Sequence, residues 1–183
     1  MGDRPTGDEE PSKADLEGLP PSDTEILTEI EEFDSVVGIV ADGVVGAVGG
    51  LVGTALMTVV LLVAESLGVF SRESFAQLAG LVGLGELLPP VAVGYLVFLV
   101  GGMVPWPLLF ASLKEYLPGS RDPIKGVFFA TIIWTGFVLA FYTDFAGLAL
   151  VGYIFFTLVA HWVYGFGLGS VFEYLSTRPD TVV

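Results

Sequence analysis

Four long apolar stretches, each bracketed by charged residues, dominate the hydropathy pattern of the chain. The brackets are Asp42 and Glu65, Glu86 and Lys114, Lys125 and Asp144, and Asp144 and Glu173, and they enclose 22, 27, 18 and 28 residues. An α-helix needs about 20 residues to cross a bilayer. The pattern therefore predicts an all-α fold, a four-helix transmembrane bundle, with spans at about 43–65, 87–113, 125–143 and 147–172.

The pattern changes on both sides of this transmembrane domain, which we place at 35–175. Residues 1–34 are rich in Pro, Gly, Asp and Glu, a composition typical of a disordered tail. Within that tail, Ser22 and Glu25 form a capping box for a short amphipathic helix near 22–34. This helix either simply precedes the membrane or docks on a partner. Residues 176–183 form a C-terminal tail.

The connection between the first two spans, residues 66–86, contains a shorter helical pattern. Ser71 can cap a helix there, and glycines at 80, 83 and 85 interrupt it. Its apolar residues recur at helical spacing: Phe75, Leu78, Ala79 and Val82. We expect a short interfacial or re-entrant helix on the outer side of the membrane.

Composition supports the membrane assignment and shows where the charge lies. The chain is 53% hydrophobic, with a mean hydropathy of +0.76, which is too apolar for a soluble domain. The net charge is −14, and residues 1–34 hold twelve of the 21 acids but only two of the seven bases. This balance argues against nucleic acid as a partner and suits a protein that works in high salt, as in a halophilic archaeon.

The distribution of lysine and arginine predicts the orientation in the cell membrane. Four spans place both termini on one side, together with the loop at 114–125. That side carries six bases, and the other side carries only Arg72. Because positive residues concentrate on the cytoplasmic side, we expect cytoplasmic N- and C-termini.

Glycines and prolines within the spans predict where helices pack closely and where a helix bends. Glycines spaced four apart form faces for close helix packing: Gly46 with Gly50, Gly49 with Gly53, and Gly165 with Gly169. These faces serve either packing within the bundle or an interface with another subunit or a second copy. Pro105 and Pro107 predict a kink in the second span, or a gating hinge.

His161 is the only histidine, and it lies within the fourth span. Counted from Gly147 at 1.5 Å per residue, it is about 20 Å into the membrane. A neutral imidazole there needs a hydrogen-bond partner, and candidates on other spans are Thr54, Thr58, Thr131, Thr135 and Trp134. Packing is one interpretation of this histidine. The others are a haem b ligand, a proton carrier and a metal ligand, and no second histidine is present to complete a haem or metal site.

The sequence offers no set of catalytic residues. The acids near the spans lie at the membrane edges, and cysteine is absent, which excludes thiolate chemistry and disulfides. We therefore expect a protein that is not an enzyme and has neither a catalytic nor a metal site. A small channel or transporter remains an alternative, based on the glycine-rich first span and the two prolines.

Several stretches resemble a family of short haloarchaeal membrane proteins of unknown function. They are GGLVGTALMTVVLLVAESLGVF, SFAQLAGLVGLG, WPLLFASLKEYLPG, IIWTGFVLAFY and AHWVYGFGLGSVFEYL. Relatives in this family are associated with respiratory oxidase gene clusters. One histidine cannot hold the haems and copper of an oxidase core. The resemblance therefore implies an accessory subunit or assembly partner of a membrane complex, surrounded by lipid and other subunits. A haem-binding electron-transfer protein using His161 is the alternative.

Overall fold

The computed structural model describes residues 21–84 and 89–176, with side chains from residue 43 onward except at positions 81 and 176. Met1–Ala41 and Asp42–Val183 are separate compact units. In the first unit, only the backbone of residues 21–41 is described, and it is helical. Residues 1–20 of the predicted disordered tail, and residues 177–183 of the C-terminal tail, lie outside the described part.

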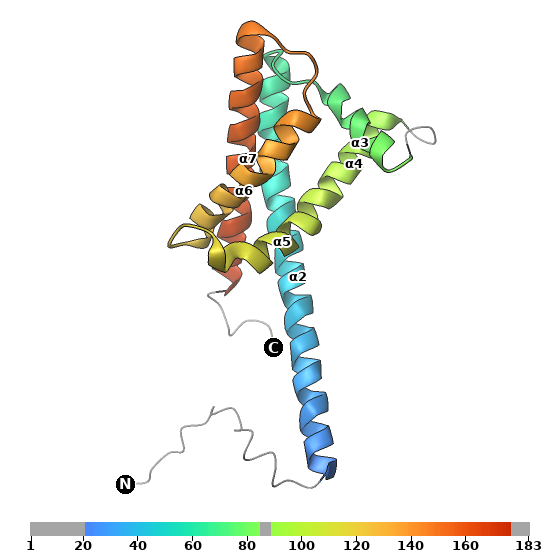
Figure 1. Cartoon of the computed structure of the whole chain (residues 1–183), viewed down its shortest axis with the longest axis vertical. Helices are drawn as coiled ribbons and strands as arrows, with labels where there is room; N and C mark the ends of the chain where they lie inside the picture. Colours follow the sequence, from blue (N-terminus) through green and yellow to red (C-terminus); the bar gives the residue numbers. More distant parts are fainter. Residues whose placement is uncertain (1–20, 85–88, 177–183) are drawn as a thin grey trace. The chain divides into compact units, whose positions relative to one another are not determined.

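The described residues form helices and no strand (Figure 1). The order is α2 (Pro21–Ser66), η1 (Arg72–Phe75), α3 (Ala76–Leu81), α4 (Pro90–Met103), α5 (Pro105–Leu113), η2 (Lys114–Tyr116), α6 (Asp122–Ala140) and α7 (Gly147–Ser176). The segment predicted as a short helix near 22–34 is the beginning of α2 rather than a separate element.

Four helical stretches are long and apolar enough to cross a membrane, and one of them combines α4, α5 and η2. They are Gly43–Ser66, Pro90–Tyr116, Asp122–Ala140 and Gly147–Leu175. The predictions of an all-helical chain and of four spans are therefore confirmed, and the chain has the features of a multi-pass membrane protein. Large apolar side chains are exposed along all four, including Val59, Leu96, Ile132 and Phe155, each at least 58% exposed.

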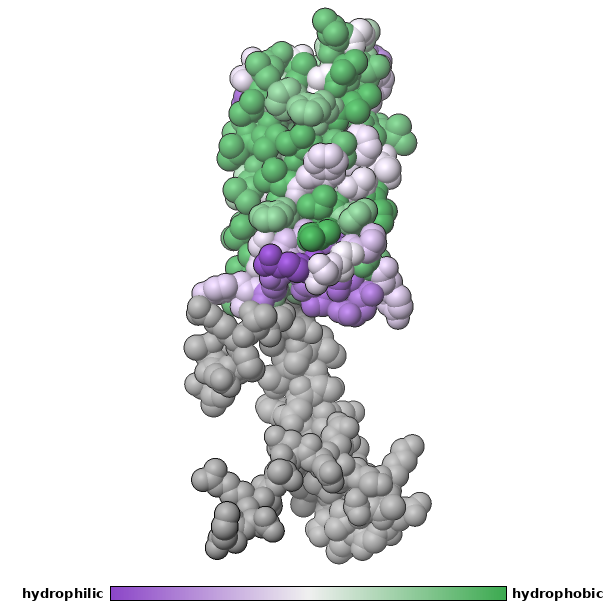
Figure 2. All heavy atoms as spheres, turned by 90° about the vertical axis from the view of Figure 1, so that its left-hand side faces the viewer, coloured by the Kyte–Doolittle hydropathy of each residue, from purple (hydrophilic) through white to green (hydrophobic). Residues whose placement is uncertain are grey.

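The surface of the second unit is divided between apolar and charged zones. Figure 2 shows apolar residues over most of the helical surface and hydrophilic residues gathered near one edge. Ion pairs lie at the ends of the spans: Arg72 contacts Glu65 at 2.6 Å, and Arg121 contacts Glu173 at 2.5 Å. Hydrogen bonding to these carboxylates raises the pKa of both arginines. Charges at span ends and apolar residues between them match the profile of a bilayer.

Glycines allow α6 and α7 to approach until their backbones touch. A Cβ atom added to Gly126 would overlap the carbonyl oxygen of Gly165, and one added to Gly165 would overlap the carbonyl oxygen of Gly126. Any larger residue at either position would have to separate the helices, because backbone atoms cannot rotate away. This contact positions the two helices that carry one wall of the site described below.

The connection between α2 and α4 folds against the helices. Ser71 caps η1 by accepting a hydrogen bond from the backbone N–H of Glu73 at 3.3 Å. Phe75 is buried, and its ring meets those of Tyr95, Phe98 and Phe141 at centroid distances of 5.1–5.4 Å. The segment is thus fixed to the membrane-spanning helices by aromatic contacts.

The second span is interrupted at Val104, directly before the first of its two prolines. α4 ends at Met103, and α5 begins at Pro105. Because proline has no N–H, Pro105 and Pro107 cannot donate to the preceding turn. The break leaves carbonyl groups at the end of α4 that need other donors.

Candidate functional site

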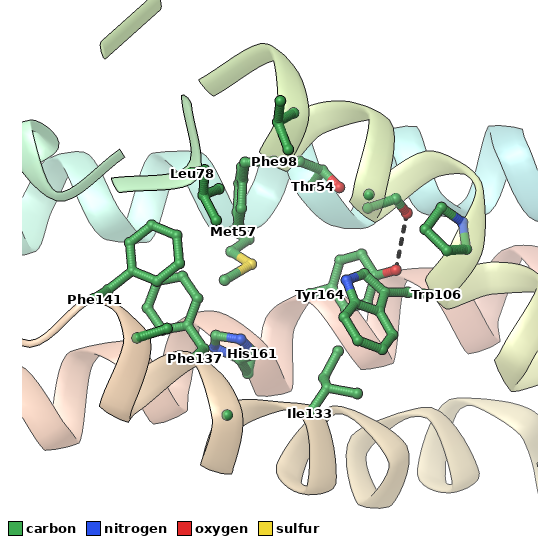
Figure 3. A pocket seen from close by; sticks show the side chains of 16 residues that line it. Thr54, Met57, Leu78, Phe98, Trp106, Ile133, Phe137, Phe141, His161 and Tyr164 are labelled. Carbon is green, nitrogen blue, oxygen red and sulfur yellow. Dashed lines mark hydrogen bonds between the residues drawn. The ribbon is translucent and has the colours of Figure 1, made fainter. Parts of the chain in front are cut away.

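A cavity of about 350 Å³ lies among the membrane-spanning helices of the second unit. Its walls come from α2, α3, α4, α5, α6 and α7, and nearly all of its lining is apolar. In Figure 3, His161 lies beside Phe137 at one end, Thr54 and Trp106 lie toward the other, and Met57 lies between them. The cavity is therefore an apolar site with a small number of polar groups.

His161 contributes one ring nitrogen that has no hydrogen-bond partner in the described part of the chain. Its side chain is buried, with the residue 3% exposed, and its Nδ1 lies 2.8 Å from the carbonyl oxygen of Thr157. Because a carbonyl oxygen only accepts, Nδ1 carries the proton and Nε2 keeps its lone pair. Nε2 has no hydrogen bond to any residue that the structure describes. The ring packs against Phe137 with centroids 4.6 Å apart.

The hydrogen-bond partner of His161 differs from the predicted ones. We expected a side chain on another span, but the partner is a carbonyl one turn back on the same helix. Four of the five predicted candidates instead bond elsewhere: Thr58, Thr131, Thr135 and Trp134. Trp134 Nε1 donates to the Thr157 hydroxyl at 3.0 Å, and Thr131 accepts from Trp162 Nε1 at 2.9 Å. Trp134 therefore ties α6 to the same turn of α7 that orients the histidine.

A second polar corner of the cavity lies where α2, α4 and α7 meet. The Tyr164 hydroxyl donates to the carbonyl oxygen of Gly102 at 2.9 Å (dashed line in Figure 3). This bond satisfies a carbonyl next to the helix break at Val104. Thr54 is 1% exposed, and its hydroxyl has no hydrogen-bond partner among the described residues. An unpaired buried hydroxyl costs free energy unless a ligand or water pairs with it.

Replacing Tyr164 by phenylalanine is expected to destabilise the protein by about 1–2 kcal/mol, because the buried Gly102 carbonyl loses its donor. Thermal unfolding of the detergent-solubilised protein measures the effect. Tyr116→Phe is the matched control, since Tyr116 is 86% exposed. Equal melting temperatures for the two variants would contradict this role of Tyr164.

The rim of the cavity lies on surfaces that face the bilayer. Ile133, Gly136, Phe137 and Ala140 follow one face of α6 and line the cavity. Of these, Gly136 and Ala140 are exposed, and Trp106 of α5, which also lines the cavity, is 41% exposed. All of these residues belong to candidate membrane spans. The exposed part of the cavity lining therefore lies on membrane-spanning segments.

Comparison with known proteins places the chain in a family. Residues 40–183 match the Family of unknown function (DUF6789). The chain belongs to the DUF6789 family. No curated protein and no solved structure matches the DUF6789 chain.

The glycines that we singled out in the DUF6789 chain lie against neighbouring helices. A Cβ atom added to any of them would come close to a residue of another helix. The glycines and these neighbours are Gly46 and Pro107, Gly49 and Leu168, Gly50 and Gly102, Gly53 and Tyr164, Gly165 and Gly126, and Gly169 and Asp122. Pro107 is itself buried, whereas Pro105 is exposed and lines the cavity. These faces are thus occupied within the chain.

The geometry fits a small uncharged ligand better than haem. The Nε2 atom of His161 and the sulfur of Met57, two residues that line the cavity, are atoms of the kinds that ligate haem iron. Haem also carries two carboxylates, and neither lysine nor arginine is among the described residues that line the cavity. The described residues also contain no cluster of three His, Asp or Glu side chains for a metal ion.

Proposed function

We propose that this DUF6789 protein is a non-catalytic membrane protein that binds a small, uncharged, lipid-soluble molecule in the cavity beside His161. The observation that carries the proposal is an apolar cavity lined by two buried residues, His161 and Thr54, whose Nε2 and Oγ1 atoms have no hydrogen-bond partner among the described residues. Ligand sites have this composition: apolar walls with a few polar groups that fix orientation.

The route of entry supports a ligand that dissolves in the bilayer. The exposed rim residues Trp106, Gly136 and Ala140 belong to membrane spans, so a molecule enters from lipid rather than from water. No charged side chain is among the described residues that line the cavity. A phosphate or carboxylate placed there would lose its hydration without gaining a counter-charge, which costs several kcal/mol.

In this proposal the protein carries no haem and acts as an accessory subunit or assembly partner of a haloarchaeal membrane complex. The resemblance to relatives near respiratory oxidase genes supports that setting, and the acidic composition supports a halophilic source. The side of the membrane that holds both termini carries six lysines and arginines, and the other side carries one. This distribution supports cytoplasmic termini in the cell membrane. Because the glycine faces are occupied within the chain, a partner subunit would contact the exposed apolar side chains instead.

Mass spectrometry of extracts from the purified protein tests the proposal. The full chain is purified in mild detergent from a halophilic host, extracted with organic solvent and analysed beside an unrelated membrane protein prepared identically. We expect an uncharged lipid-soluble molecule at about one per chain, and a visible spectrum with no haem band. A profile indistinguishable from that of the unrelated protein would contradict the proposal.

A further inference from the structure

We infer that the ligand is a hydroxylated aromatic ring of the phenol class, whose hydroxyl donates a hydrogen bond to His161 Nε2. The inference rests on the proposed function and narrows it to one chemical class. It depends on the tautomer of His161, the absence of charge among the described lining residues, and the aromatic rings around the histidine.

The tautomer requires a ligand that donates. A neutral imidazole has one donor and one acceptor, and the Thr157 carbonyl already takes the donor. Ketones, ethers and esters can only accept, so they would leave Nε2 buried and unpaired. The Thr54 hydroxyl does not discriminate in this way, because a hydroxyl can both donate and accept.

The lack of charge excludes the other common donors. An ammonium group could donate to Nε2, but it would enter an apolar cavity with no carboxylate among the described lining residues. A carboxylic acid would ionise at neutral pH and present lone pairs to the lone pair of Nε2. An uncharged hydroxyl group satisfies Nε2 without these costs.

The surroundings of His161 favour an aromatic ring as the body of the ligand. Phe137 contacts the imidazole and stacks on Phe141 with centroids 4.1 Å apart. Phe98 lies 6.2 Å from Phe137 and 6.4 Å from Phe141, so three phenylalanine rings form one wall of the cavity. Aromatic rings pack favourably edge-to-face or offset on such a wall.

Trp106 provides a reporter, because it lines the cavity without a hydrogen bond to His161. Bromine quenches tryptophan fluorescence at contact, so we would titrate the detergent-solubilised full chain with 4-bromophenol and with 4-bromoanisole. These probes share ring and bromine, but the methyl ether cannot donate. We expect 4-bromophenol to bind about tenfold more tightly, the value of one hydrogen bond to a buried acceptor.

Two variants test whether the preference for 4-bromophenol depends on His161 and whether the quenching reports on this cavity. The outcomes also distinguish failure of the phenol assignment from failure of the proposed ligand site. In His161→Phe the ratio of affinities should fall to about one, and in Trp106→Phe the ligand-dependent quenching should disappear. Equal affinities of the wild-type chain for both probes would overturn the phenol assignment and leave the apolar site in place. The wild-type comparison needs no variant to fold. Absence of saturable quenching by either probe would overturn the proposed function itself.

Discussion

A leucine at Gly126 is expected to destabilise the protein by more than about 3 kcal/mol, whereas a leucine at Gly136 of the same helix is expected to leave its stability nearly unchanged. The Cβ of a residue at 126 would overlap the backbone carbonyl of Gly165, and no rotamer relieves that overlap. At Gly136 an added Cβ meets nothing within 4 Å. The two substitutions have equal hydrophobicity and helix propensity, so their difference measures the α6–α7 contact.

Thermal unfolding in detergent, followed by circular dichroism and size-exclusion chromatography, compares the two variants. We expect Gly126→Leu to aggregate or to melt far below wild type, and Gly136→Leu to elute and melt like wild type. Gly165→Leu should behave like Gly126→Leu, because the two residues form the same contact. A stable, monodisperse Gly126→Leu protein would show that α6 and α7 do not pack as described.

The same Gly136→Leu variant is expected to lower occupancy of the cavity at least about tenfold. Gly136 lines the cavity on the face of α6 that also carries Ile133 and Phe137. A leucine side chain there would occupy space that the ligand needs, and removing even a few ligand contacts costs the 1.4 kcal/mol that corresponds to tenfold in affinity. The amount of molecule extracted per chain measures occupancy.

Gly80→Leu is the matched control for this experiment. Gly80 is exposed on α3, has open space around it, and does not line the cavity. The control protein should carry as much of the molecule as wild type. Equal occupancy in Gly136→Leu and Gly80→Leu would place any bound molecule outside this cavity.

The sequence was sufficient to predict the elements of the fold, because charges bracket each span. The charges at 42, 65, 86 and 114 lie near the ends of the first two spans that the structure contains. The cap at Ser71 was also predictable, since an N-cap depends on residues close in sequence. Span ends and N-caps can be predicted because each depends on the residues of one segment. They do not depend on how that segment packs against the other helices.

The site could be predicted only in part. His161 was singled out as the one ionisable group deep in a span, but its partner is a main-chain carbonyl, which no side-chain pattern reveals. Gly136 and Ile133 were not singled out at all. Residues that face a cavity and residues that face lipid are equally apolar, so hydropathy cannot separate them. The distinction depends on how neighbouring helices pack.

Nitrogen NMR of the protein labelled with ¹⁵N only in histidine tests the central claim most directly. The chain contains one histidine, so both ring resonances report on His161 alone. We predict a proton on Nδ1, an unprotonated Nε2, and a shift of the Nε2 resonance when 4-bromophenol is added but not when 4-bromoanisole is added. A proton on Nε2, or an Nε2 resonance unmoved by both probes, would contradict a ligand site built around this nitrogen.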